Sequence, residues 1–125
     1  MSKKKVLVID DNPAIVRLDE SLLGSQDYEV IKAYDGEEGF QKAQKEKPDI
    51  ILLDVILPGI HGFELCKKIK ENEETKDIPI VIVTASGLEE VAKEEPDIKA
   101  DAYISKPYGL EELMNVIKNI EGKQG

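Results

Sequence analysis

The chain has 125 residues and a formal net charge of −9 at pH 7. This length suits one compact domain, which we expect to span residues 1–125. The acidic balance argues against direct binding to nucleic acid or to an anionic membrane surface, because such binding needs a basic patch. No apolar stretch approaches the roughly 20 residues of a membrane span. The single cysteine, Cys66, excludes an internal disulfide and fits a reducing, cytoplasmic compartment.

Continuous apolar runs predict the strands of a parallel sheet. The runs at 6–9 (VLVI), 50–53 (IILL) and 80–83 (IVIV) do not alternate with polar residues. This pattern is typical of strands that are covered on both faces. A weaker strand is expected at 29–33 (EVIKA) and a short one at 102–105 (AYIS).

Helical patterns separate these strands. Asn12 followed by Pro13 predicts the start of the first helix. Asp35 begins the second helix, and Pro48 stops it. The remaining helices are expected at 62–74, at 86–95 and from 110 to Gly122, where glycine would end the last one.

Strands and helices therefore alternate five times in the prediction. This order implies a parallel sheet with helices on both faces, and right-handed crossovers leave few topologies for it. We expect an α/β fold, a flavodoxin-like doubly wound (βα)5 sandwich of three layers. Its five-stranded parallel sheet would have the order 2-1-3-4-5.

Polar residues follow the ends of four predicted strands. Asp10 and Asp11 follow the first strand, Asp54 the third, Thr84 the fourth and Lys106 the fifth. In a doubly wound sheet, ligands bind beyond the carboxyl ends of the strands, where the strand order reverses. We therefore expect these side chains to share one crevice.

Three carboxylates in one crevice are unfavourable without a cation, because like charges repel. Oxygen ligands without His or Cys suit a hard cation such as Mg²⁺, which keeps part of its water shell. A phosphoryl group could then meet the metal, the positive charge of Lys106 and the hydroxyl of Thr84. Since an aspartate can be the nucleophile and form an acyl phosphate, the residues indicate a phosphoryl-transfer site.

The sequence resembles the receiver domain of bacterial two-component response regulators, in the form of a stand-alone, chemotaxis-regulator-like receiver. The resemblance lies in the stretches VLVIDDNP, PDIILLDVILPGIHG, PIVIVTAS and ADAYISKPY, and it covers nearly the whole chain. It implies that Asp54 is the phosphorylated residue. It also implies that Asp11 and Asp54 bind Mg²⁺ with the backbone carbonyl of Ile56, while Asp10 acts mostly through a coordinated water.

The same resemblance implies a conformational switch. Thr84 would hydrogen-bond the phosphoryl group and move toward it, and Lys106 would pair with it, held by a cis bond to Pro107. Tyr103 would turn between outward and inward positions as Thr84 moves. The surface formed by the fourth helix, fifth strand and fifth helix would then change toward a partner-binding state. The fourth helix departs most from the family pattern, because Pro96 stops it early.

The resemblance also implies the partners. A sensor histidine kinase or phosphotransfer protein would donate the phosphoryl group, and an unidentified protein would be the downstream target. The chain would catalyse only its own phosphorylation and dephosphorylation, as a monomer or a phosphorylation-dependent dimer in the cytoplasm. No output domain follows the last helix, so we expect either a domain that works alone or a part of a longer protein.

Other functions of this topology fit the residues less well. The complete set of Asp, Thr and Lys argues against a constitutive adaptor that never receives phosphate, without excluding it. A phosphatase of the haloacid dehalogenase type places two acids two residues apart after the first strand, whereas Asp10 and Asp11 are adjacent. A flavodoxin-like electron carrier would find its FMN phosphate repelled by the same two acids.

Cys66 and His61 could carry chemistry by residue type, but we expect neither to belong to the site. Cys66 is expected to be a small packed residue of the third helix rather than a reactive thiol. His61 is expected to be an exposed loop residue whose charge could change near neutral pH.

Overall fold

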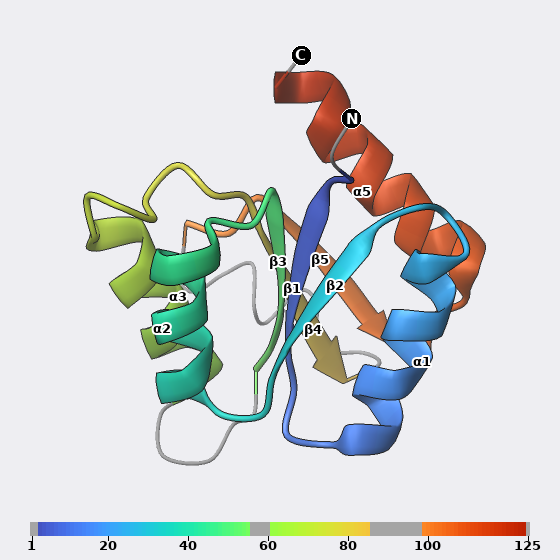
Figure 1. Cartoon of the computed structure of the whole chain (residues 1–125), viewed down its shortest axis with the longest axis horizontal. Coiled ribbons are helices and arrows are strands. Elements are labelled where there is room, and N and C mark those ends of the chain that lie inside the picture. The colour runs from blue at the N-terminus through green and yellow to red at the C-terminus, as the bar shows by residue number, and fades with distance from the viewer. Residues whose placement is uncertain (1–2, 56–60, 86–98, 125) are drawn as a thin grey trace.

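The computed structural model describes residues 3–55, 61–85 and 99–124. In Figure 1 these segments form a central sheet between two layers of helices. The sheet has five parallel strands in the order β2-β1-β3-β4-β5, as predicted. The strands are β1 (Lys5–Ile9), β2 (Glu29–Ala33), β3 (Ile50–Asp54), β4 (Ile80–Ala85) and β5 (Ala102–Lys106).

Four helices within the described segments cover the sheet. They are α1 (Pro13–Gly24), α2 (Gly36–Glu46), α3 (Gly62–Glu71) and α5 (Leu110–Gln124). Figure 1 shows α1 and α5 on one face of the sheet and α2 and α3 on the other. The helix predicted at 86–95 lies outside the described residues.

Each face of the sheet has its own apolar core. Val6 and Val8 of β1 belong to the core that includes residues of α1 and α5. Leu7 and Ile9 belong to the other core, which includes residues of α2 and α3. Successive side chains of a strand point to opposite faces, so a strand covered on both faces must be apolar throughout. This requirement explains the continuous apolar runs in the sequence.

The predicted starts of the first two helices are confirmed by their caps. Oδ1 of Asn12 accepts a hydrogen bond from the backbone N of Ala14 at 2.9 Å, and Pro13 is the first helical residue. Oδ1 of Asp35 likewise accepts from the backbone N of Glu38 at 2.8 Å. Each contact satisfies an amide that has no partner within its own helix.

Two predicted helix ends were wrong. Helix α3 ends at Glu71 rather than at 74, because Asn72 has an extended backbone and its side chain accepts from the backbone N of Glu74 at 2.9 Å. Helix α5 continues through Gly122 to Gln124. Gly122 does not have the positive φ with which glycine ends a helix, so no such cap forms there.

Candidate functional site

Three acidic side chains meet at the carboxyl edge of the sheet. Asp10 and Asp11 directly follow β1, and Asp54 is the last residue of β3. One carboxylate oxygen from each residue lies within 4.8 Å of the oxygens that the other two offer. Asp10 and Asp54 are 3% and 9% exposed, whereas Asp11 is exposed to solvent. A carboxylate set of this kind, open on one side, fits a hard cation that keeps some of its water.

Lys106, the last residue of β5, supplies a positive charge to this group of acids. Its Nζ donates to Oδ2 of Asp10 at 3.1 Å and lies 3.4 Å from Oδ2 of Asp54. Burial lowers the pKa of the Lys106 ammonium, but the two carboxylates outweigh burial and raise that pKa above its ordinary value. Lys106 is therefore charged at neutral pH. Its bond to Pro107 is cis, as predicted.

The two adjacent acids have different surroundings. The backbone N of Asp10 donates to the carbonyl of Ala33, at the end of β2, at 3.1 Å. Its Oδ1 accepts from the backbone N of Asn12 at 2.9 Å, while its Oδ2 meets Lys106. Asp10 is thus held in one orientation, and Asp11 faces solvent. The pair DD therefore places one oriented, buried carboxylate beside one that is accessible.

Helix α3 begins in close contact with the end of β3. A Cβ atom on Gly62 would lie 2.4 Å from the carbonyl oxygen of Asp54 and 2.6 Å from Cα of Val55, so only glycine fits there. The backbone N of Gly62 donates to the carbonyl of Val55 at 2.7 Å. The start of α3 therefore fixes the main chain that carries Asp54.

Thr84 and Tyr103 lie on the neighbouring strands β4 and β5. Thr84 lies near the end of β4, is 4% exposed and pairs in register with Ser105 of β5. Tyr103 is partly buried and packs against the core on the α2–α3 face, and burial raises the pKa of its phenol. Movement of these two side chains stays a prediction. Ile56, the expected carbonyl ligand, lies outside the described residues.

Sequence reasoning missed a polar pair next to the site. The hydroxyl of Tyr108 donates to Oδ1 of Asp19 at 2.7 Å, and Asp19 is only 2% exposed. Burial raises the pKa of Asp19 to about 6. Burial, followed by the Asp19 carboxylate, also raises the pKa of Tyr108. The signal in the sequence was an acid at an apolar position of the first helix, between Val16 and Leu23.

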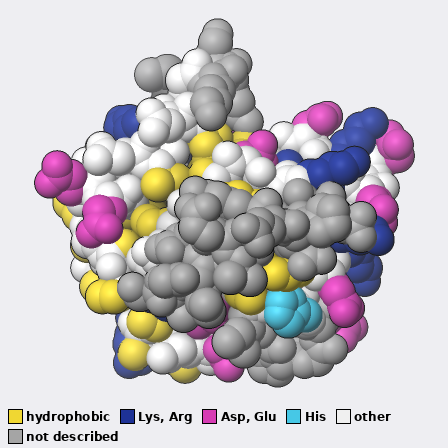
Figure 2. All heavy atoms as spheres, turned by 180° about the vertical axis from the view of Figure 1, so that it is seen from behind, with side chains coloured by type: hydrophobic (Ala, Val, Ile, Leu, Met, Phe, Trp, Pro, Cys, Tyr) yellow, Lys and Arg dark blue, Asp and Glu magenta, His cyan; other side chains and the backbone are white. Residues whose placement is uncertain are grey.

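Cys66 and His61 have structural roles. Cys66 is fully buried in the core on the α2–α3 face, and burial raises the pKa of its thiol to about 11. His61 is exposed, as predicted, and the histidine lies at the surface of the face shown in Figure 2. Its Nδ1 also accepts from the backbone N of Phe63 at 3.1 Å, so His61 caps helix α3, which the sequence reasoning did not foresee.

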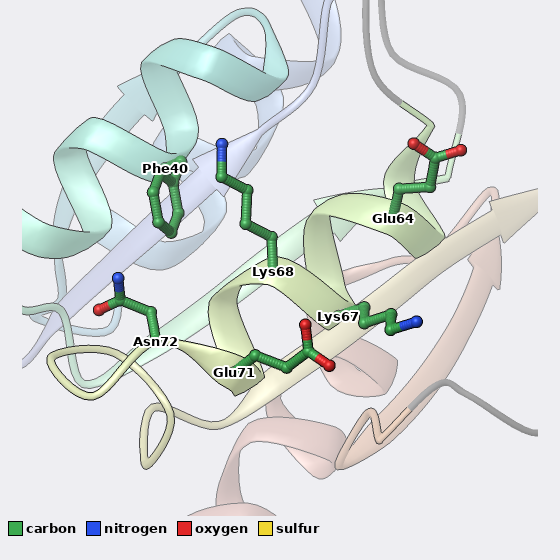
Figure 3. Close-up of a pocket in the computed structure, with 6 residues that line it drawn as sticks. All are labelled: Phe40, Glu64, Lys67, Lys68, Glu71 and Asn72. Carbon is green, nitrogen blue, oxygen red and sulfur yellow. The ribbon is translucent and has the colours of Figure 1, made fainter.

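A shallow groove lies between α2 and α3, away from the three acids. Figure 3 shows that Phe40 comes from α2 and that Lys68 crosses toward it from α3. Nζ of Lys68 lies 4.4 Å from the centre of the Phe40 ring. The other residues that line the groove are Glu64, Lys67, Glu71 and Asn72. None of the predicted site residues that the structure describes lines this groove.

No helix of the described segments is both long enough and apolar enough to span a membrane.

The sheet topology and the acidic edge define an α/β domain that gathers carboxylates and a lysine at the carboxyl ends of its strands, a set suited to phosphoryl chemistry. Residues 6–118 match the response regulator receiver domain family, and the chain belongs to this family. It is therefore a receiver domain of the kind found in two-component response regulators. Phosphorylation on an aspartate is the general function of such domains.

The chain is also similar to individual curated proteins, of which PhoP is one. The chain is 40% identical over 117 residues to the alkaline phosphatase synthesis transcriptional regulatory protein PhoP of Bacillus subtilis; the match covers 94% of this chain and 48% of PhoP. The chain spans about half the length of the curated relatives it matches.

Solved structures show the same fold. Chemotaxis response regulator CheY4 of Vibrio cholerae is similar with a TM-score of 0.88 and 32% identity, over 95% of this chain and 99% of that chain. The receiver domain of sensor histidine kinase PA1611 from Pseudomonas aeruginosa has a TM-score of 0.85 and 26% identity, over 94% and 97% of the two chains. The latter structure has a magnesium ion coordinated in its active site cleft.

Proposed function

We propose that this chain accepts a phosphoryl group on Asp54 from a sensor histidine kinase or a phosphotransfer protein, with Mg²⁺ as cofactor. The observation that carries the proposal is the meeting of three carboxylates with the ammonium of Lys106 at one sheet edge. Asp10 and Asp54 are both buried and both lie next to Lys106. Asp54 is assigned as the acceptor because, of the three acids, it is the last residue of a strand, the position that matches the phosphorylated aspartate of the receiver family.

The metal would be held by Asp11 and Asp54, with Asp10 acting through a water and the carbonyl of Ile56 as a further ligand. The carboxylates fit this ion because they provide only oxygen donors. The magnesium site of the PA1611 receiver domain supports the assignment. When bound, Mg²⁺ would neutralise charge on the phosphoryl oxygens.

The chain's own residues would do the rest of the transfer. A carboxylate oxygen of Asp54 attacks phosphorus, the bond from phosphorus to the donor's histidine nitrogen breaks, and that nitrogen keeps the electron pair. Lys106 then pairs with a phosphoryl oxygen, which it can reach because its Nζ already lies 3.4 Å from Asp54. Thr84 donates its hydroxyl to another phosphoryl oxygen. Water would then attack the phosphorus of the acyl phosphate, breaking its bond to the Asp54 oxygen and releasing inorganic phosphate, and this dephosphorylation would be the only other reaction that the domain catalyses.

The phosphorylated state would be read by another protein. Thr84 would move toward the phosphoryl group, Tyr103 would turn inward, and the surface that includes β5 and α5 would change. PhoP is named as a transcriptional regulatory protein and CheY4 as a chemotaxis response regulator. With a net charge of −9, this chain favours a protein target over direct contact with nucleic acid.

We further propose that residues 1–125 form one receiver domain, acting in the cytoplasm as a monomer or as a phosphorylation-dependent dimer. The free, buried thiol of Cys66 is in keeping with a reducing compartment.

Intact mass spectrometry after incubation with Mg²⁺ and acetyl phosphate tests the proposal. We expect one added phosphoryl group on the wild-type protein and none on Asp54→Asn or in a metal-free sample. An adduct that persists in Asp54→Asn would contradict the assignment of the acceptor. If no sample gains an adduct, binding of beryllofluoride with Mg²⁺ distinguishes a short-lived acyl phosphate from an adaptor that never accepts phosphate.

A further inference from the structure

Asp19 occupies a position of α1 that faces the sheet. The buried residues of α1 are Val16, Asp19 and Leu23, and their spacing of three and four places them on one side of the helix. Val16 and Leu23 belong to the core on this face of the sheet. A carboxylate in such an apolar stripe is costly unless it is hydrogen-bonded, so its presence here requires a reason.

Tyr108 provides the hydrogen bond. Its hydroxyl lies 2.7 Å from Oδ1 of Asp19, a length typical of an O–H donor on a charged oxygen. Tyr108 lies in the connection between β5 and α5, and its ring packs against the same core as Val16. The bond therefore ties this connection to α1, across 89 positions of the chain.

The same connection begins at Lys106. On one side, Lys106 is held in β5, which pairs with β4 in register from Val81↔Ala102 to Ala85↔Lys106. On the other side, only Pro107 separates it from Tyr108. The main chain of Lys106 is thus fixed between a sheet pairing and the bond to α1, while its Nζ reaches Asp10 and Asp54.

Asp19 also lies within the electrostatic reach of the site. Burial has the largest effect on the pKa of Asp19 and raises it. The hydrogen bond from Tyr108 and the charge of Lys106 lower this pKa, whereas the charge of Asp10 raises it. The pair is therefore coupled to the acids and the lysine of the crevice as well as to the core.

We propose that the hydrogen bond from Tyr108 to Asp19 positions the ammonium of Lys106 for phosphoryl transfer to Asp54. The inference rests on the proposed function of Asp54. Phenylalanine at position 108 and leucine at position 19 would fill the same space without a polar group. What the Tyr108–Asp19 hydrogen bond adds is a fixed orientation of the β5–α5 connection relative to α1. An ammonium that is already in place needs no reorganisation during transfer, which raises the maximal rate without tightening donor binding.

Three variants isolate this role. Tyr108→Phe removes the hydroxyl alone. The double variant Asp19→Leu with Tyr108→Phe removes both polar partners, so no buried carboxylate is left unpaired and stability is recovered. Tyr28→Phe is the matched control: its hydroxyl donates to Oε1 of Glu121 at 2.9 Å and its ring packs in the same core, but it directly precedes β2 at the opposite edge of the sheet.

Two measurements are made on each protein. Saturation kinetics with acetyl phosphate and Mg²⁺ give the maximal phosphorylation rate and the half-saturating donor concentration. NMR relaxation of the Lys106 ε-carbon, in the unphosphorylated protein, gives the order parameter of that side chain. Both Tyr108→Phe proteins should lose about tenfold in maximal rate at an unchanged half-saturating concentration. Both should also show a lower order parameter at Lys106, whereas Tyr28→Phe should match the wild type in both measurements.

Wild-type rates and order parameters in Tyr108→Phe would overturn the proposal. An equal loss in Tyr28→Phe would overturn it too, because general stability would then explain the effect. If the double variant regained the wild-type rate together with its stability, positioning would likewise be excluded. If the wild-type protein accepts no phosphoryl group, the proposed function fails, and the Lys106 order parameters alone decide whether the pair positions the lysine.

Discussion

Nζ of Lys106 donates a hydrogen bond to Oδ2 of Asp10 at 3.1 Å, although the two residues lie 96 positions apart in the chain. The same ammonium lies 3.4 Å from Asp54. Two buried carboxylates that would otherwise repel each other therefore share one positive charge. This arrangement places the lysine next to the proposed acceptor.

Replacing Lys106 with methionine should lower stability in a way that depends on metal. We expect the free energy of unfolding to fall by about 1–3 kcal/mol in metal-free buffer, because Asp10 and Asp54 lose their hydrogen-bonded counter-charge. Millimolar Mg²⁺ should restore most of this loss, since a cation that binds only the folded state stabilises it. Urea denaturation with EDTA and with Mg²⁺ measures both effects.

Lys32→Met is a suitable control for this experiment. Lys32 pairs with Glu20 at 3.2 Å on the surface, where both side chains are well exposed. Its loss should change stability by less than about 1 kcal/mol in either buffer. A Lys106→Met protein that is equally destabilised with and without Mg²⁺ would show that the metal does not take over the role of the lysine.

Gly62→Ala should disturb the end of β3. The added methyl group would lie 2.4 Å from the carbonyl oxygen of Asp54, and because the obstacle is backbone, the main chain must shift. We expect a loss of about 3 kcal/mol in stability, together with slower phosphorylation. Gly24→Ala is the control, because a Cβ there meets nothing within 4 Å. Unchanged stability in Gly62→Ala would mean that α3 does not press on the acceptor strand.

Asp19 should make stability depend on pH between about 4 and 6. Burial raises the pKa of Asp19 from 3.8 in the unfolded chain to about 6 in the fold. The folded state therefore holds the proton more tightly, so this carboxyl contributes most stability at low pH and loses it as pH rises through 6. Relative to wild type, Asp19→Asn should become more stable by on the order of 2 kcal/mol between pH 4 and pH 8.

Urea denaturation of both proteins across this pH range tests the sign as well as the size. A constant difference between Asp19→Asn and wild type would show that Asp19 does not titrate in this window.

His61 should stabilise α3 as its cap. His61→Ala removes the acceptor for the backbone N of Phe63, and we expect a loss of about 1 kcal/mol in thermal or urea denaturation. His61→Asn, which offers a good capping side chain, should retain most of the stability. Equal losses in both variants would point to the contact of the His61 and Phe63 rings, whose centres are 4.9 Å apart, rather than to the cap.

The sheet and the residues that meet at its edge can be predicted from the sequence alone. Runs such as IILL at 50–53 must be covered on both faces, and the alternation with helices then leaves few right-handed topologies. In this topology Asp54 and Lys106 end their strands and Asp10 directly follows one, all at the same edge of the sheet. Caps such as Asn12 were also predictable, because a helix start depends on its own neighbours.

The tertiary structure alone decided the contacts between distant side chains. The bond from Tyr108 to Asp19 joins a loop to a helix 89 positions away, and glycine is required at position 62 because α3 approaches the end of β3 so closely. Local patterns also failed at Gly122, where the helix continues to Gln124. Periodicity shows which face of an element is buried, but the partner of a buried polar group depends on distances between elements, and these arise only when the whole chain packs.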